Sequence, residues 1–390
     1  MNLKDMKIAV PEEIMNGENR VSITPEIAKS MVDDGAEVYV QAGAGEGSFF
    51  NDSEYEKAGA EIIEDVEKLF SMADLILKVK EPQFNDEVNK HEVDMMKKGQ
   101  YLVTFLHPAS PGNHEMIKEI AEKGIISLTL DSIPRISKAQ AMDTLTSMST
   151  VAGYKGVVMA TDILPEFMPM INTGVGMIKP ANALVLGTGV AGLQAVATAK
   201  RLGAVIHAAD IRPDASEQAQ SIGAKLIDLE VPAEKAVGEG GYAQKLPENL
   251  LKKEREILAD KIKDFDLIVL TALIPGKVAP ILITEEMVKS LKPGSVIVDI
   301  AIDQGGNCEI TEPGKIVEKH GVTIIGTKNI PGLLPKSSTW LFSKNINKFI
   351  SYIVEDAEID INSEDEIISS TLVTDGEKVV HNGALEAMNK

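Results

Sequence analysis

A glycine-spaced turn between two apolar runs constrains this sequence most. The run Leu184-Val185-Leu186 enters Gly187-Thr188-Gly189-Val190-Ala191-Gly192, an apolar helical pattern follows, and a second apolar run ends at Asp210. A strand, a Gly-x-Gly-x-x-Gly turn, a helix and a second strand that ends in an acid about 20 residues later are the fingerprint of a dinucleotide-binding unit. A glycine turn that binds nothing is the alternative, but the register of all these parts favours a binding site.

The glycines and the acid have separate physical roles. Gly187 permits a tight turn, Gly189 lets a pyrophosphate approach the backbone, and Gly192 lets the helix pack on the strand with its N-terminus toward the phosphates. We expect Asp210 to accept hydrogen bonds from both ribose hydroxyls of NAD, because a carboxylate repels a 2′-phosphate. Arg212 softens that preference.

Length and charge narrow the class of protein. The 390 residues exceed one ordinary core, so two domains are expected. A balance of 39 basic against 59 acidic residues gives a net charge of −20, which argues against a nucleic-acid partner. A single cysteine, Cys308, excludes a disulfide framework. The sequence shows neither a signal peptide nor an apolar run of membrane-spanning length, so a cytoplasmic protein without direct membrane insertion is expected.

Alternating strand and helix patterns predict an α/β fold with two Rossmann-like domains and parallel sheets. In the N-terminal portion, strands are expected at 7–10, 37–40, 75–80, 101–106 and 125–131, with helices opening at Thr24-Pro25 and over 53–60 and 113–123. Further along, strands are expected at 266–272, 295–300 and 322–326, with a helix over 284–291. Long helices over 137–163 and 338–353 would join a first domain (1–143 plus 331–390) to a Rossmann domain (144–330), with a ligand cleft between them.

An irregular insertion over 233–248 contains Gly238-Glu239-Gly240-Gly241-Tyr242-Ala243. A long insertion without periodicity is either a lid or a loop of no consequence. Its glycines and Tyr242 favour a mobile flap over a neighbouring site.

Four polar residues lie close to the ends of predicted strands. Arg20, Lys80 and His107 belong to the first domain, and Asp303 follows the strand at 295–300. Each alone is more often a surface group, but the carboxyl edge of an α/β sheet is where ligands bind. Together they predict a site.

A second constellation follows in the run from Pro134 to Thr146. Asp143 can hold Arg135, and Gln140 offers both a donor and an acceptor to an amide such as the carboxamide of nicotinamide. An exposed charged turn is the alternative. The six histidines have no paired ligand spacing, so no metal site is expected.

With these residues in view, the chain resembles the alanine dehydrogenase and nicotinamide nucleotide transhydrogenase alpha-subunit superfamily over nearly its whole length. Both branches share segments like 8–13, 20–25 and 43–45. The loop from Pro134 to Gln140 with Asp143 is similar to the loop that surrounds the nicotinamide in the transhydrogenase branch. The run 240–243 resembles that branch's mobile loop, whose tyrosine folds over bound nucleotide, and 272–277 and 305–308 complete the likeness.

The resemblance implies the soluble NAD(H)-binding component, the first portion of a split alpha subunit, of a Re/Si-specific, proton-translocating NAD(P) transhydrogenase. Such a component is a homodimer, lies at the cytoplasmic inner face of the cell membrane, and docks on membrane-spanning and NADP(H)-binding subunits. It implies roles in hydride transfer for Gln140, Arg135, Asp143 and Tyr242. The implied cofactor-binding set is Gly187, Gly189, Val190, Ala191, Gly192, Asp210, Ile211, Arg212, Thr146, Gly241, Ala272 and Leu273.

Other segments match alanine dehydrogenase instead. They are 78–82, 105–107, 302–306, 329–331 and 335–339, and the matching arginine and lysine in that enzyme bind the substrate acid while its histidine and aspartate support amination. The corresponding set here is Arg20, Lys80, His107 and Asp303. Two positions depart from the transhydrogenase pattern: Thr146 stands in place of serine, and Gln244 replaces the lysine of the flap.

We rank the transhydrogenase component above an NAD-dependent alanine dehydrogenase. The flap and the 135–143 loop would be superfluous in a dehydrogenase, whereas direct transfer between two nicotinamide rings requires only that the rings be brought together and water excluded. Deamination needs a carboxylate clamp and proton carriers, which Arg20, Lys80, His107 and Asp303 could supply. A catalytically silent nucleotide-sensing subunit is a third alternative.

Overall fold

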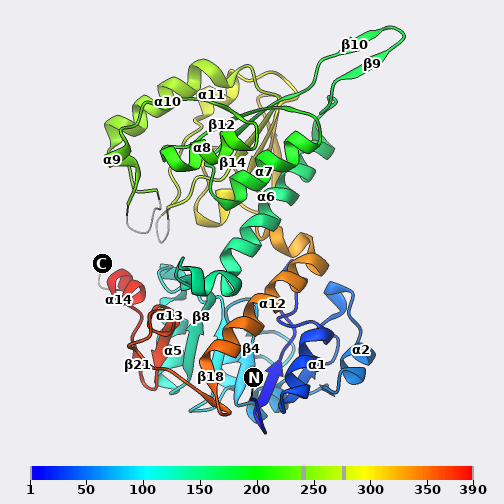
Figure 1. The fold of residues 1–390 in the computed structure, drawn as a ribbon, viewed down its shortest axis with the longest axis vertical. Coiled ribbons are helices and arrows are strands. Elements are labelled where there is room, and N and C mark those ends of the chain that lie inside the picture. Colours follow the sequence, from blue (N-terminus) through cyan, green and yellow to red (C-terminus); the bar gives the residue numbers. More distant parts are fainter. Residues whose placement is uncertain (1, 239–242, 275–277, 389–390) are drawn as a thin grey trace. The chain divides into compact units, whose positions relative to one another are not determined.

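A computed structural model describes residues 2–238, 243–274 and 278–388, in two compact units. Unit 1 comprises Met1–Met148 and Gly332–Lys390, and unit 2 comprises Ser149–Pro331. The chain leaves unit 1 within helix α6 (Thr144–Ile163) and re-enters it just before helix α12 (Pro335–Ile353) (Figure 1). From the sequence we expected these divisions at 143/144 and 330/331, whereas the units divide at 148/149 and 331/332.

The sheet of unit 1 has eight strands in the order β21-β20-β8-β7-β4-β1-β2-β3. The six strands from β3 to β8 are parallel, while β20 pairs antiparallel with β8 and β21 antiparallel with β20. The sheet is therefore mainly parallel, and its last two strands come from the C-terminal part of the chain. The strands are β1 (Lys7–Val10), β2 (Glu37–Gln41), β3 (Glu61–Ile63), β4 (Leu75–Leu77), β7 (Tyr101–Thr104), β8 (Ile126–Thr129), β20 (Leu372–Asp375) and β21 (Lys378–Val379).

Helices cover both faces of this sheet. One apolar core joins α1 and α12 to the strands, and Phe342, Phe349 and Ile353 of α12 are fully buried in it. A second core on the other face contains Leu69 of α3 and Ile117 of α5. The helices are α1 (Pro25–Asp33), α2 (Asp52–Lys57), α3 (Val66–Met72), α4 (Glu92–Met95), α5 (His114–Glu122), α12, α13 (Glu366–Thr371) and α14 (Asn382–Met388), with 3-10 turns η1 (Glu46–Ser48), η2 (Pro111–Asn113) and η3 (Leu130–Ser132) and small ribbons β5–β6 (Phe84–Asn85, Lys90–His91) and β18–β19 (Val354–Glu355, Glu358–Ile359).

Local sequence explains the first helix. Thr24 is its N-cap, with its side chain accepting a hydrogen bond from the Ile27 N–H, and Pro25 occupies the first helical position. Gly35 follows the helix with φ of +101°, a conformation that favours glycine. The predictions of the strand at 7–10 and of the helix opening at Thr24-Pro25 are confirmed.

The sheet of unit 2 has seven strands in the order β13-β12-β11-β14-β15-β17-β16. All are parallel except the edge strand β16, which pairs antiparallel with β17. The glycine turn follows the central strand β11. The strands are β11 (Asn182–Leu186), β12 (Val205–Ala209), β13 (Lys225–Leu226), β14 (Leu267–Leu270), β15 (Val296–Asp299), β16 (Ile316–Lys319) and β17 (Val322–Ile325).

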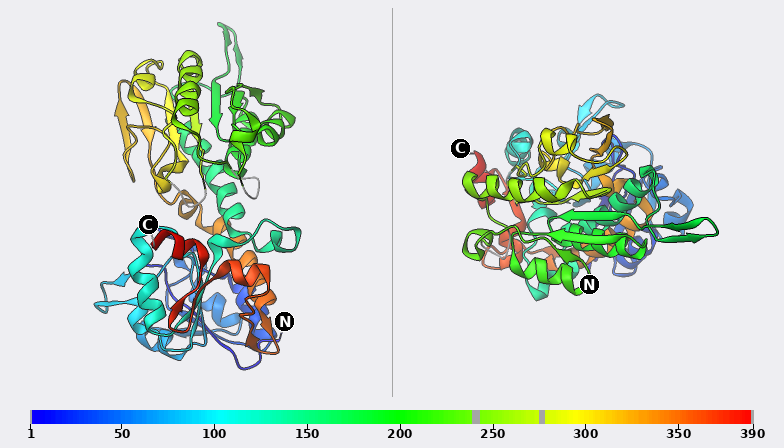
Figure 2. Two further views of the ribbon diagram at one scale, coloured as in Figure 1. Left: turned by 90° about the vertical axis from the view of Figure 1, so that its left-hand side faces the viewer. Right: turned by 90° about the horizontal axis from the view of Figure 1, so that it is seen from above.

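Side chains of β11 alternate between two apolar cores. Ala183 and Val185 pack with α6, α7 and α8, and Leu184 and Leu186 pack with α10 and α11. This three-layer arrangement confirms the α/β fold class with two Rossmann-like domains. The remaining elements are α7 (Val190–Arg201), α8 (Pro213–Ser221), α9 (Ala233–Ala236), α10 (Glu248–Ile262), α11 (Glu285–Lys289), η6 (Ile300–Gln304), η7 (Ile330–Leu333) and the hairpin β9–β10 (Ile171–Thr173, Gly176–Ile178), which projects from the rest of unit 2 (Figures 1 and 2).

The predicted continuous helix over 137–163 is wrong in its first turns. A 3-10 helix, η4 (Ser137–Met142), is followed by Asp143 with ψ of 89°, and α6 begins at Thr144. The Asp143 carboxylate accepts hydrogen bonds from the Thr146 N–H (2.8 Å) and hydroxyl (2.6 Å). Because a side-chain acceptor just before the first turn caps a helix, Asp143 fixes a new start for α6.

Three strands of unit 1 are shorter than expected from the sequence. β4, β7 and β8 end at Leu77, Thr104 and Thr129, because the backbone beyond them bonds to carboxylates instead of continuing the sheet. Glu13 accepts the Val79 N–H at 2.5 Å, and Asp131 accepts the His107 N–H at 2.6 Å.

Within the described ranges, no helix is long and apolar enough to cross a membrane. The same residues also contain no group of three His, Cys, Asp or Glu side chains arranged to hold a metal ion.

Candidate functional site

The glycine turn of unit 2 has the backbone that a dinucleotide site requires. Gly187 has φ of +85°, and a Cβ there would lie 2.8 Å from the Ala272 nitrogen. A Cβ on Gly192 would lie 1.9 Å from the Gly187 oxygen, so only glycine allows α7 to approach the turn this closely.

The N-terminus of α7 points its first backbone N–H groups away from the helix body. Gly189 is the N-cap and has no side chain with which to cap Val190, Ala191 and Gly192, the first helical residues. A Cβ on Gly189 would meet just one atom within 4 Å, the Arg212 Nη2 at 3.8 Å. Uncapped N–H groups beside open space fit an anionic pyrophosphate.

Asp210, directly after β12, is the most heavily bonded acid of this region. Its Oδ2 accepts from the Thr188 N–H (2.7 Å) and the Arg212 Nη2 (2.8 Å), and its Oδ1 accepts from the Arg212 N–H (2.8 Å) and Nε (3.0 Å). Asp210 thus ties the turn to the end of β12, and the ion pair raises the pKa of Arg212 because the Asp210 hydrogen bond favours the charged guanidinium. Ile211 between them packs on the apolar core that contains α10.

The end of β14 forms the other wall of the turn. The Thr271 hydroxyl donates to the Gly187 carbonyl at 2.7 Å, Ala272 is half-buried, and Leu273 is exposed. Pro275-Gly276-Lys277, and Gly241 and Tyr242 of the predicted flap, lie outside the described residues.

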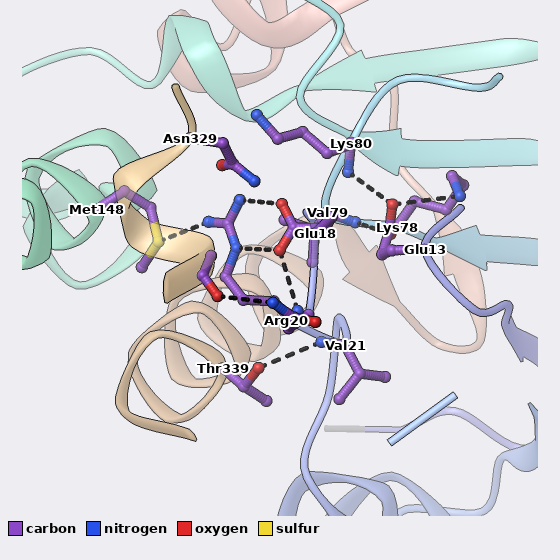
Figure 3. A network of polar contacts seen from close by, with 12 residues as sticks. Glu13, Glu18, Arg20, Val21, Lys78, Val79, Lys80, Met148, Asn329 and Thr339 are labelled. Atoms are coloured by element: carbon purple, nitrogen blue, oxygen red, sulfur yellow. Dashed lines mark hydrogen bonds and ion pairs between the residues drawn. The ribbon is translucent and has the colours of Figure 1, made fainter. Parts of the chain in front are cut away.

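In unit 1, Arg20 is buried and paired with an acid that the sequence patterns did not single out. Its Nε and Nη2 donate to the two oxygens of Glu18 at 2.7 and 2.5 Å, and its Nη1 lies 2.9 Å from the Met148 Sδ (Figure 3). Burial alone raises the pKa of Glu18, but the charge and hydrogen bonds of Arg20 outweigh it and lower that pKa. Glu18 stays ionised and orients the guanidinium.

Lys78, not Lys80, is the buried lysine of unit 1. Its ammonium lies 2.9 Å from Glu92 and 3.3 Å from Glu13, while Glu13 also accepts the Val79 and Lys80 N–H groups (Figure 3). Burial raises the pKa of Glu13 to about 7, against the opposing charge of Lys78. The cluster fixes the backbone that carries Lys80, whose side chain is half-exposed.

His107 forms a pair with Asp131, 2.7 Å from its Nδ1. Burial lowers the pKa of His107, but the charge and hydrogen bond of Asp131 raise it to a net value above the ordinary one. His107 has φ of +46°, an unfavourable conformation for histidine, which the Asp131 hydrogen bond to its N–H stabilises.

The remaining candidates lie on shorter segments. Gln140 on η4 and Arg135 before it are exposed, and Asp143 bonds Thr146 as described. The predicted bond between Arg135 and Asp143 stays a prediction. Asp303 in unit 2 is exposed, and its Oδ2 accepts the Asn329 N–H at 3.2 Å.

Sequence reasoning missed the partners more than the candidates. Glu18, Glu13, Asp131 and Asn307 are acids and an amide within a few residues of loops, where single-sequence patterns give no signal. Glu18 two residues before Arg20 was the one local cue available.

Two Rossmann-like units, one of them with the complete glycine turn and the acid after its second strand, define the class of nucleotide-dependent oxidoreductases. Family models described as "Alanine dehydrogenase/PNT, N-terminal domain" and "Alanine dehydrogenase/PNT, C-terminal domain" match residues 9–152 and 156–382. The chain belongs to this alanine dehydrogenase/NAD(P) transhydrogenase family.

Individual relatives agree with the resemblance seen in the sequence. The first of the separate parts of NAD(P) transhydrogenase subunit alpha from Rhodospirillum rubrum is 42% identical over 379 residues, covering 96% of this chain and 98% of the relative. Alanine dehydrogenase of Bacillus subtilis (strain 168) is 35% identical over 346 residues, covering 86% and 82%. The crystal structure of transhydrogenase from Sinorhizobium meliloti superposes with a TM-score of 0.84 at 38% identity, covering 96% and 100%. The predicted relation to transhydrogenase alpha subunits is confirmed.

Proposed function

We propose that this chain is the NAD(H)-binding component of a proton-translocating NAD(P) transhydrogenase, and that it presents NADH to NADP⁺ held by a partner subunit. The observation that carries the proposal is the glycine turn from Gly187 to Gly192, with uncapped N–H groups at α7 and Asp210 tied to the turn. The higher identity to a transhydrogenase alpha subunit (42%) than to an alanine dehydrogenase (35%) supports it.

The residues of unit 2 would hold the nucleotide by its phosphates and ribose. The first N–H groups of α7, at Val190, Ala191 and Gly192, would donate to the pyrophosphate, and Asp210 would accept from the ribose hydroxyls. Arg212 and Ile211 would lie beside the ribose, and Ala272, Leu273 and Gly241 would complete the binding surface.

When bound, NADH supplies the hydride from C4 of its nicotinamide, so the chain itself needs no acid or base for transfer. Gln140 would orient the carboxamide through one donor and one acceptor, with Arg135, Asp143 and Thr146 shaping the loop around it. Tyr242 would exclude water. Their task is positioning, which alone can supply several kcal/mol of barrier lowering (roughly 7 to 11 in the best-oriented cases).

The family relation also suggests the assembly. We propose a homodimer that docks, at the cytoplasmic face of the cell membrane, on a membrane-spanning subunit and a subunit that binds NADP(H). The proposal rests on the subunit name carried by the transhydrogenase relative.

Reconstitution tests the proposal directly. The purified chain should bind NADH in equilibrium dialysis, and on mixing with an NADP(H)-binding transhydrogenase subunit it should catalyse reduction of an NAD analogue by NADPH. The chain without the partner, and the partner without the chain, are the controls. NADH binding with no hydride exchange in any mixture would contradict the transhydrogenase assignment.

Alanine dehydrogenase is the second candidate, because Arg20, Lys80 and the His107–Asp131 pair could serve a small amino acid. The test is turnover of L-alanine with NAD, followed as NADH absorbance. Turnover that His107→Asn abolishes, together with no exchange between nucleotides, would reverse the ranking.

A further inference from the structure

A buried carboxamide holds the residue that lies against the glycine turn. Asn307 is fully buried, and its Oδ1 accepts the Ala272 N–H at 2.9 Å. Its Nδ2 donates to the Ala272 carbonyl and to the Pro280 carbonyl, both at 2.8 Å. The side chain thus bonds both backbone polar groups of Ala272, as a neighbouring strand would, two residues beyond the end of β14.

Asn307 is itself fixed from the end of β15. The buried Asp299 carboxylate accepts the Asn307 N–H at 2.9 Å, the Cys308 N–H at 3.0 Å and the Thr311 hydroxyl at 3.0 Å. Gly306 has φ of +82°, and a Cβ there would lie 2.7 Å from the Asp299 Oδ2. Because each donor converges on one carboxylate, the loop that carries Asn307 has little freedom.

Ala272 is in turn the nearest neighbour of Gly187 across the sheet edge. The Ala272 nitrogen and Cα would lie 2.8 and 2.9 Å from a Cβ on Gly187, and the Thr271 hydroxyl bonds the Gly187 carbonyl. A shift of Ala272 would therefore move the wall against which the turn packs.

We propose that Asn307 is a positioning residue for the dinucleotide site: through Ala272, it holds the Gly187–Gly192 turn in its binding conformation without contacting the nucleotide. This inference rests on the proposed function, because it assigns NADH to that turn. It also assigns a role to Ala272, whose N–H is used by Asn307 and which would therefore meet the nucleotide by packing.

Asn307 variants of the full chain test this. Asn307→Ala removes all three side-chain bonds, and Asn307→Asp keeps the acceptor but loses both donors and adds a charge beside Asp299. We expect the Kd for NADH to rise about tenfold or more in both, measured by equilibrium dialysis well below Tm, because buried donors and acceptors lose their partners. In Asn307→Asp the Kd should fall again as the pH is lowered, since a protonated carboxyl can donate once; in Asn307→Ala it should not.

A matched control separates positioning from general loss of stability. Ile325→Ala opens a cavity in the core of unit 2, on a strand two positions away from β14, and should lower Tm to a comparable degree. Its Kd for NADH should stay within about twofold of the parent, because the bonds of Asn307 are intact. Equal weakening in Ile325→Ala and the Asn307 variants would overturn the inference.

Failure of the proposed function and failure of the positioning role give different results. A parent chain that binds no NADH overturns the proposed function and this inference with it, whereas parental Kd values in folded Asn307 variants overturn only the inference. If neither Asn307 variant folds, Thr311→Val carries the test by removing one of the bonds to Asp299. A Kd raised by about two- to threefold would support the positioning role, and an unchanged Kd would refute it.

Discussion

Asp210 shows how a single carboxylate can be both structural and functional. Its oxygens already accept from Thr188 and Arg212, and a carboxylate offers only about four lone-pair directions. Ribose hydroxyls would therefore have to share Asp210 with, or displace, the Arg212 guanidinium. The acid was found from its distance to the glycine turn, but its partners were not.

We expect Asp210→Ala to weaken NADH binding by about 2 to 4 kcal/mol, through the loss of one or two charge-assisted hydrogen bonds. Equilibrium dialysis measures this change. Asp260→Asn, an exposed acid on α10, is the control and should leave the Kd unchanged. An unchanged Kd in Asp210→Ala would mean that the ribose binds elsewhere.

The His107–Asp131 pair makes a pH-dependent contribution. Because Asp131 raises the pKa of His107 above its unfolded value of 6.5, the stabilisation is complete below pH 6.5 and is lost as the pH rises through the folded value. Asp131→Asn should lower the pKa of His107, measured by NMR titration of the imidazole. Glu81→Gln, which removes a weaker carboxylate effect, should lower it less. An unaltered midpoint in Asp131→Asn would contradict the pairing.

At the scale of elements, α10 shows why a helix can be hidden in a sequence. Leu251, Leu258 and Ile262 face the core, but Glu254 interrupts this apolar stripe and is itself buried. Periodicity alone therefore gave no helix over 248–262. Packing against the sheet, rather than the pattern, stabilises it.

Glu254 should make the stability of unit 2 fall with pH. Burial, helped by the charge of Asp210, raises the pKa of Glu254 to about 7 from 4.5. Between these values the unfolded chain loses the proton and the folded chain keeps it, so the free energy of unfolding should drop by on the order of 3 kcal/mol from about pH 4.5 to about pH 7.

Glu254→Gln should abolish that part of the decline, measured by urea unfolding at several pH values. Glu256→Gln, an exposed neighbour on the same helix, is the control and should follow the parent. Glu13, whose pKa is also raised, titrates equally in the parent and the variant, so their difference isolates Glu254. Parallel parent and Glu254→Gln curves would refute the assignment.

At the scale of the whole molecule, the two units differ in how the chain builds them. Unit 2 is one continuous segment, whereas unit 1 needs the C-terminal residues from Gly332 onward. The C-terminal part supplies α12, whose Phe342 and Phe349 lie in the core, and β20, where the buried Thr374 hydroxyl bonds Ser127 and the Ile125 carbonyl.

Truncation after residue 331 should therefore unfold unit 1 and spare unit 2. We expect proteolysis to remove residues 1–148 rapidly, while a fragment near 149–331 resists and still binds NADH. A separately expressed 149–331 fragment is the control for its intrinsic stability. Protection of unit 1 in the truncated chain would show that its core does not depend on α12.

The sequence by itself determined the α/β class, the order of the main strands, the start of α1 and the glycine turn with Asp210. These depend on period, capping and spacing, which act between residues close along the chain. Tertiary structure alone decided the antiparallel strands at the ends of both sheets, the break at Asp143, and the pairs Arg20–Glu18, His107–Asp131 and Asn307–Ala272. Those features join groups from different loops, or substitute a side-chain bond for a backbone one, and a single sequence carries no signal of which distant polar groups will be buried together.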